Sequence, residues 1–225
     1  MLVVIGVNEQ GEKQFLAIED GVRKSTHSWR EVLVKLKARG LTQALALAVG
    51  DGALDEVYPE TRPQRFGVHK TANVLNYLPK SVQPKVQQAL QKIRMAPTRS
   101  VSCRTFDLLV EMDQAKYPKA TECLKKDRET LLAFYDFPVE HWPPIRTSNP
   151  IESSFATIRH RTHQMLECAS RETLLTMMFK LGQCAEGRWR RIRGFPYLAK
   201  VITGVRFTDG IEKIDHSLKN SRSAT

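Results

Sequence analysis

The chain has 225 residues, 41% of them hydrophobic, which is enough apolar material for a buried core and excludes a disordered tail. Lys and Arg number 35 against 24 Asp and Glu, a net charge of +11 that favours a polyanionic partner over a membrane surface. The apolar N-terminal run is too short to span a membrane. Four widely spaced cysteines and no secretory leader predict reduced thiols and a cytoplasmic protein.

The positive charge is unevenly distributed. Residues 1–60 hold 7 basic and 9 acidic side chains, whereas residues 146–206 hold 11 basic and 4 acidic ones. A surface for nucleic acid accounts for this asymmetry, although scattered Lys and Arg also serve solubility alone.

The first third of the chain predicts alternating strands and helices. Residues 2–19 contain two β-rich runs around a polar turn with a glycine, which predicts an antiparallel hairpin. A helix with Ser28 as its N-cap and Gly40 at its end follows. Residues 44–50 return to a strand, and Asp51 stands at the exit of that strand between two glycines.

The rest of the chain is mainly helical. A short strand is expected within residues 63–70, although its proline and glycine weaken the pattern. Apolar spacings of three and four then predict several helices before residue 146 and one more after it: 82–95, 105–117, 120–137 and 170–189. In the last of these, we interpret the apolar stripe as core and not as a binding groove; it contains Leu174, Leu175, Met178, Phe179, Leu181 and Ala185.

The stretch "TSNPIESSFATIRHRTH" at residues 147–163 has two interpretations. Asn149 is a good N-cap, Pro150 suits the first helical position, and Glu152 stands three residues after the cap as in a capping box. Alternatively, Glu152 is a metal ligand that meets a second carboxylate from a strand end. Paired carboxylates hold the divalent ions used in phosphodiester chemistry, so spacing alone leaves both interpretations open.

Several segments of the sequence resemble the Mutator-type transposases of bacterial insertion sequences. They include "VGDGALDEVYPETRPQR", "LPKSVQPK", "IRTSNPIESSFATIRHRT" and "FKLGQCAEGRWRRIRGFPYLAKVITGV", in the order the family has them. The resemblance implies an α/β protein with a ribonuclease H-like mixed sheet. The implied division is a catalytic core at 1–79 and 148–187, a helical insertion at 80–147, and a basic C-terminal segment and tail at 188–225.

The resemblance also implies a mechanism with three catalytic acids, in which DNA is cleaved and joined at transposon ends with Mg²⁺ or Mn²⁺. Asp51 matches the family's second acid and Glu152 its last, although a "GDG" at a strand exit is otherwise often only a turn. Candidate DNA contacts are Arg159, Arg161, Arg188, Arg190, Arg191 and Arg193, with Trp189 available to stack on a base. The plain alternatives are a solvated helix face and cations that offset a helix dipole.

The sequence departs from the family pattern at several places. No acid matches the family's first Asp, and the central first strand is missing, which would leave residues 2–8 and 44–50 without ladder partners. Phe66 replaces a family cysteine, so His69 is expected to be structural and not a zinc ligand. We therefore expect a truncated, inactive transposase. The alternative is a nonenzymatic DNA-binding remnant that forms homo-oligomers or mixed assemblies with an intact transposase.

Overall fold

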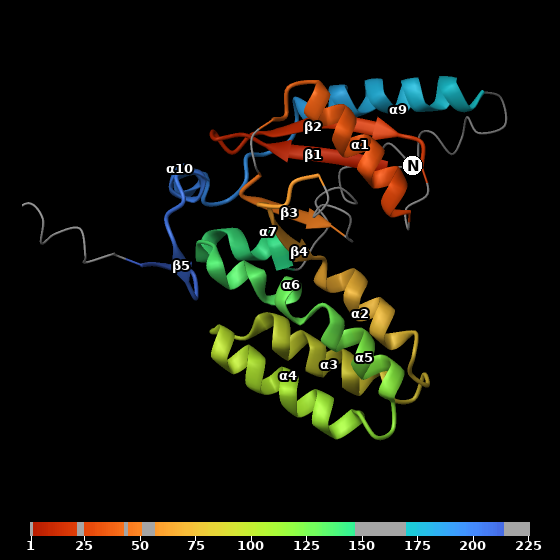
Figure 1. Ribbon diagram of the computed structural model, residues 1–225, viewed down its shortest axis with the longest axis vertical. Coiled ribbons are helices and arrows are strands. Elements are labelled where there is room, and N and C mark those ends of the chain that lie inside the picture. The colour runs from red at the N-terminus through yellow and green to blue at the C-terminus, as the bar shows by residue number, and fades with distance from the viewer. Residues whose placement is uncertain (1, 22–24, 43–44, 51–56, 147–169, 214–225) are drawn as a thin grey trace, which may run out of the picture.

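The computed structural model describes residues 2–21, 25–42, 45–50, 57–146 and 170–213. The described elements are mixed helices and strands, which confirms the α/β class (Figure 1). A hairpin with two helices lies at one end of the molecule, a parallel strand pair lies in the middle, and a block of helices lies at the other end (Figure 1).

The predicted hairpin is confirmed. β1 (Leu2–Val7) pairs antiparallel with β2 (Lys13–Glu19), and a register shift falls between Val4 and Ile5. The side chain of Asn8 closes the turn, because its Oδ1 accepts hydrogen bonds from the backbone N–H groups of residues 10 and 12 at 3.1 and 2.9 Å. Gly11 supplies the positive φ of 77° that this turn needs.

Two helices cover opposite faces of the hairpin. α1 (Thr26–Ala38) packs Val32 and Leu36 against Leu2 and Ala17. α9 (Arg171–Glu186) contributes to a second cluster that centres on Phe15 of the hairpin and includes Met178, Phe179 and Leu181. Successive strand residues point to opposite faces, so each helix covers a different set of them. These three residues of the α9 stripe are half-buried, so their packing inside the fold is confirmed.

The N-cap of α1 is three residues earlier than predicted. Ser25 is the N-cap, and its Oγ accepts a hydrogen bond from the backbone N–H of Ser28 at 3.2 Å. The prediction of Ser28 was wrong because both serines precede the apolar spacing, and only the backbone at Ser25 is extended as a cap requires.

β3 (Leu47–Gly50) and β4 (Arg62–Arg65) form a parallel pair in which Gly50 lies opposite Arg65. The predicted strand at 63–70 is thus right only as far as Arg65. α2 (Gly67–Leu75) begins two residues later, before the first of the helices predicted ahead of residue 146, which was 82–95. The side chains of Leu47 and Val49 in β3 pack against the hydrophobic core of the helical block.

The described strands form three separate two-stranded sheets. β1 pairs only with β2, and β3 pairs only with β4, so no ladder joins these two pairs in the described parts of the chain. The third sheet joins β5 (Phe207–Thr208) to β6 (Ile211–Glu212) through a turn with positive φ at Asp209 and Gly210. Sequence patterns did not predict this short hairpin.

The helical block has a continuous core. It consists of α2, α3 (Gln83–Met95), α4 (Arg99–Asp113), α5 (Pro118–Lys126), α6 (Arg128–Leu132), the 3-10 turns η1 (Ala133–Asp136) and η2 (Val139–His141), and α7 (Trp142–Arg146). Phe134, Tyr135 and Trp142 pack as an aromatic group with ring centroids 4.2–5.4 Å apart. Such rings supply much of the buried apolar area of a core.

The helix predicted over 120–137 is broken. α5 ends at Lys126, Asp127 follows with φ −112°, and α6 begins at Arg128. The apolar periodicity continues across the break, so it did not reveal that the Asp127 carboxylate is bound by another helix.

The C-terminal part of the described chain contacts both ends of the molecule. The N–H of Ile192 donates to the carbonyl of Gly11 at 2.9 Å, before η3 (Phe195–Tyr197) and α10 (Leu198–Ile202). Further on, Asp209 accepts from the N–H of Arg99 at 2.6 Å. Among the described residues no helix has the length and apolarity needed to cross a bilayer.

Candidate active site

The carboxyl ends of β3 and β4 lie side by side. Gly50 ends β3 opposite Arg65, and α2 begins at Gly67. In parallel sheets, ligands bind beyond the carboxyl ends of the strands. Asp51 is the next residue after Gly50 in sequence, although it lies outside the described residues.

A second part of the chain approaches the same place. The carbonyl oxygen of Arg146, the last residue of α7, lies 2.7 Å from the position that a Cβ on Gly67 would occupy. Residues 147–169 follow in sequence and lie outside the described residues; they contain Asn149, Glu152, Arg159 and Arg161. The described residues that flank both predicted acids thus meet at the short connection from β4 to α2.

This connection is anchored to the helical block by buried polar groups. The side-chain amide of Gln64, 2% exposed, donates to the carbonyls of Arg65 and Leu131 at 3.0 and 3.2 Å. Lys70 is 4% exposed, and its Nζ lies 2.6 Å from Oδ2 of Asp127. Arg65 Nε lies 3.3 Å from the same oxygen. One carboxylate therefore serves two cations and holds α2 and β4 to the start of α6.

A second ionic network lies at the opposite end of β4. Asp136 accepts from Arg62 at 2.9 Å and from Arg99 at 3.1 Å, and Arg99 also reaches Glu129 at 3.1 Å. The Glu129 side chain is 82% exposed, and the other groups are partly exposed, so each of these pairs contributes little on its own.

The predicted DNA-binding arginines at the end of α9 are exposed, but they are not equivalent. The Nη2 of Arg191 donates to Oε1 of Glu12 at 2.9 Å, and its guanidinium lies 5.6 Å from the ring of Phe195. Hydrogen bonds from Asn8 and then Arg191 lower the pKa of Glu12. Arg188, Arg190 and Arg193 are exposed side chains on the same segment.

Two other residues named from the sequence have defined surroundings. Trp189 is half-buried and packs in the cluster around Phe15, so its ring already has an apolar partner within the fold. His69 lies in the first turn of α2, and its ring centroid is 5.5 Å from that of Phe66. Across the described ranges, no three His, Cys, Asp or Glu side chains are grouped as a metal site would require.

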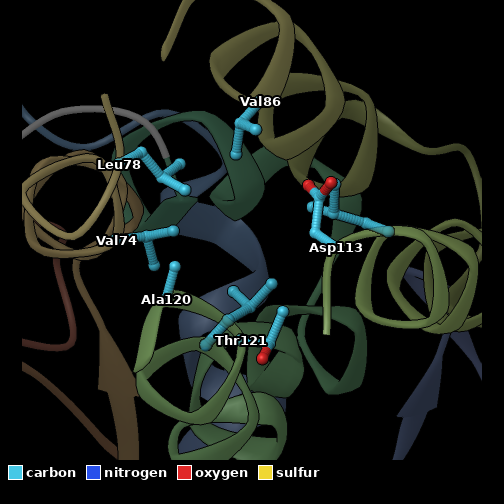
Figure 2. A pocket seen from close by; sticks show the side chains of 8 residues that line it. Val74, Leu78, Val86, Asp113, Ala120 and Thr121 are labelled. Carbon is cyan, nitrogen blue, oxygen red and sulfur yellow. The ribbon is translucent and has the colours of Figure 1, made fainter. Parts of the chain in front are cut away.

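An apolar hollow inside the helical block is not a candidate site. It lies between α2, α3, α4 and α5, and Figure 2 shows Val74 and Leu78 on one side of it and Asp113 on the other. Its volume is about 10 Å³, which is the space of a single water-sized sphere. It is a packing defect and is too small for a ligand.

Comparison with known proteins gives one consistent result. The family model described as "Transposase, Mutator family" matches residues 1–191. The transposase for insertion sequence element IST2 of Acidithiobacillus ferrooxidans is 52% identical over 217 residues, which cover 94% of this chain and 73% of that protein.

More distant relatives carry the same description. The transposase for insertion sequence element IS6120 of Mycolicibacterium smegmatis is 42% identical over 220 residues, 93% of this chain and 67% of the relative. The transposase for ISRM5 of Rhizobium meliloti is 28% identical over 198 residues, 84% of this chain and 49% of the relative.

Proposed function

The chain belongs to the Mutator family of transposases, and on that premise we propose that Asp51 and Glu152 are metal-binding carboxylates of a ribonuclease H-like site that acts on DNA. The observation that carries this proposal is the convergence of the flanking residues. Gly50, one residue before Asp51, pairs with Arg65, and the Arg146 carbonyl, six residues before Glu152, lies against Gly67. Six residues span at most about 20 Å, so Glu152 has the reach to approach Asp51.

The order of the described elements supports a ribonuclease H-like core. An antiparallel hairpin, a helix and a parallel strand pair follow one another, and the helical block separates them from Glu152. A sheet of this type has a central strand between the positions of β1 and β3. Within the described residues, β1 pairs only with β2 and β3 pairs only with β4. Each of the two strands therefore has a free edge in this part of the chain, at which a central strand could pair.

Carboxylate oxygens are the ligands that Mg²⁺ and Mn²⁺ prefer, so the chemistry of the two acids fits this role. The ions, when bound, would activate the attacking hydroxyl and stabilise the leaving oxygen. The chain's own contribution is positional. β3 ends at Gly50, so it would position Asp51 as the next residue in sequence, and the capping box of Asn149 would fix Glu152 in the first turn of a helix. Arg159 and Arg161 would bind the DNA backbone.

A second candidate function is DNA binding without cleavage, and the observation that favours it is the set of exposed side chains Arg188, Arg190 and Arg193, which can bind phosphate without metal. We predict that this polypeptide by itself binds DNA without cleaving it. As a nonenzymatic DNA-binding protein, it would act through homo-oligomers or mixed assembly with an intact transposase.

Mn²⁺ binding and DNA cleavage together test the proposal. Mn²⁺ binding to the purified chain is measured by electron paramagnetic resonance, and cleavage of transposon-end DNA is measured with Mg²⁺ or Mn²⁺. Asp51→Asn and Glu152→Gln should each weaken Mn²⁺ binding, whereas Glu111→Gln, which removes an exposed acid from α4, should not. Equal binding by wild type and Glu152→Gln would overturn the ligand roles. Cleavage that Glu152→Gln abolishes would overturn only the predicted inactivity.

A further inference from the structure

The side chain of Arg94 and the backbone of Arg146 meet at the start of α2, the two charges act on each other, and neither arginine has an acidic partner among the described residues. A Cβ built on Gly67 would lie 2.5 Å from Cδ of Arg94 and 2.7 Å from the carbonyl oxygen of Arg146. α3 and the end of α7 therefore both pack closely against Gly67. The Nε atoms of both arginines are buried and have no hydrogen-bond partner in the part of the chain that the structure describes. Within the described ranges, neither guanidinium takes part in an ion pair.

This arrangement is electrostatically unfavourable in the free protein. Burial, followed by the charge of Arg146, lowers the pKa of Arg94, and burial likewise lowers the pKa of Arg146. The neighbouring cations Arg65 and Lys70 differ, because they share the carboxylate of Asp127. Partly desolvated charges of one sign are stabilised when an anion binds between them.

The local geometry favours an anion with several oxygens. The guanidinium of Arg146 lies over the rings of Phe134 and Trp142 at 5.7 and 5.5 Å, which occupies its flat face. The N–H groups of a guanidinium point outward in its plane, in a fork that matches two phosphate oxygens.

The start of α2 adds to this preference. α2 has nine residues, no acid in its first turn, and no side-chain hydrogen bond from its N-cap Phe66. A helix start of this kind presents backbone N–H groups and partial positive charge to an anion.

We propose that Arg94 and Arg146 together bind a backbone phosphate of DNA at the start of α2, next to the carboxyl ends of β3 and β4. The inference rests on the proposed function for the identity of the polyanion. It makes the predicted helical insertion at 80–147 part of the DNA-binding surface, because both arginines lie within it, Arg94 in α3 and Arg146 at the end of α7. It also places a phosphate contact beside Gly50, where the predicted acid Asp51 follows.

Salt-dependent DNA binding tests this inference without metal. Binding of a fluorescent duplex is followed by anisotropy in EDTA at several salt concentrations. Arg94→Gln should weaken binding roughly tenfold and reduce the slope of log affinity against log salt by about one, as expected for the loss of one phosphate contact. The matched control is Arg104→Gln, which removes an exposed arginine from α4. Arg94→Lys should restore the salt slope and only part of the affinity, because it keeps the charge and loses the fork.

Thermal unfolding of the same variants separates phosphate binding from a structural role. If Arg94 repels Arg146 in the free protein, Arg94→Gln should unfold at the same temperature as wild type or higher. A lower unfolding temperature with unchanged DNA binding would mean that a carboxylate of the chain itself occupies the pair, and would overturn the proposal. Equal affinity and slope for Arg94→Gln and Arg104→Gln would overturn it too.

The two proposals also fail in different ways. If the wild-type chain binds no DNA, both the proposed DNA partner and the proposed phosphate site are wrong. Mn²⁺ binding tests the ligand roles of Asp51 and Glu152 alone, because it does not depend on Arg94 and Arg146.

Discussion

Asp127→Asn should strongly destabilise the protein. The substitution removes the charge that faces Lys70 Nζ at 2.6 Å and Arg65 Nε at 3.3 Å, and the Lys70 side chain is 4% exposed. Breaking a buried ion pair from one side typically costs about 3–5 kcal/mol, because the remaining charge stays buried without a partner. Proteins have total stabilities of about 5–15 kcal/mol, so the loss is a large fraction of the whole.

Urea unfolding measures this loss from the shift in midpoint at constant slope. For a chain of this length, the same loss corresponds to a fall in melting temperature of roughly 6–20 °C. Lys70→Met should cost much less than Asp127→Asn, because Asp127 would keep Arg65 as its partner. The double variant should recover part of the loss, since it leaves no buried ammonium without a counter-charge.

Asp107→Asn is the matched control. Asp107 pairs with Arg128 at 2.9 Å, but these side chains are 59% and 35% exposed, so the expected cost is below about 1 kcal/mol. If Asp127→Asn costs no more than Asp107→Asn, the reasoning from the burial of Lys70 is wrong.

Three further substitutions test local features of the fold. Gly67→Ala should cost about 1–3 kcal/mol in urea unfolding, because its Cβ would lie 2.7 Å from a backbone oxygen, whereas Gly187→Ala, with nothing within 4 Å, should be neutral. Ser25→Ala should cost about 1 kcal/mol and Ser28→Ala much less; the opposite order would restore Ser28 as the cap. Burial raises the pKa of Tyr135 above 10.0, so its contribution to stability is complete below that pH and is lost as the pH rises through the higher folded value. Tyr135→Phe should therefore show a shallower loss of stability in alkaline titrations than wild type; an unchanged profile would exclude Tyr135 as its source.

The predictions that held depend on patterns within a few residues. The hairpin at 2–19 and the strand before Asp51 follow from alternation and from turn residues, and α9 follows from apolar spacing, all of which act locally. The positive charge and the sequence segments that resemble the family can likewise be recognised from the amino-acid sequence without the structure. They were sufficient to identify a Mutator-family transposase before any contact between distant residues was considered.

The predictions that failed depend on distant contacts. The helix break at Asp127 coincides with an ion pair to Lys70, 57 residues away, and the early start of α2 coincides with close packing of Gly67 against α3 and α7. Sequence reasoning also missed Arg94 and Arg146, although "IRM" and "IRTSNP" contain them. In the sequence, each is an ordinary arginine near the end of a helix. Only the packing of α3 and α7 against Gly67 brings the two residues together.

The sequence by itself thus determined the class of the fold, the surplus of positive charge and the family, because these depend on residue types and local order. The tertiary structure decided that β3 and β4 end side by side, that the end of α7 packs against Gly67, and which of the nearby cations share a carboxylate. Those features arise from long-range packing, where a charge gains or lacks a partner according to residues far along the chain.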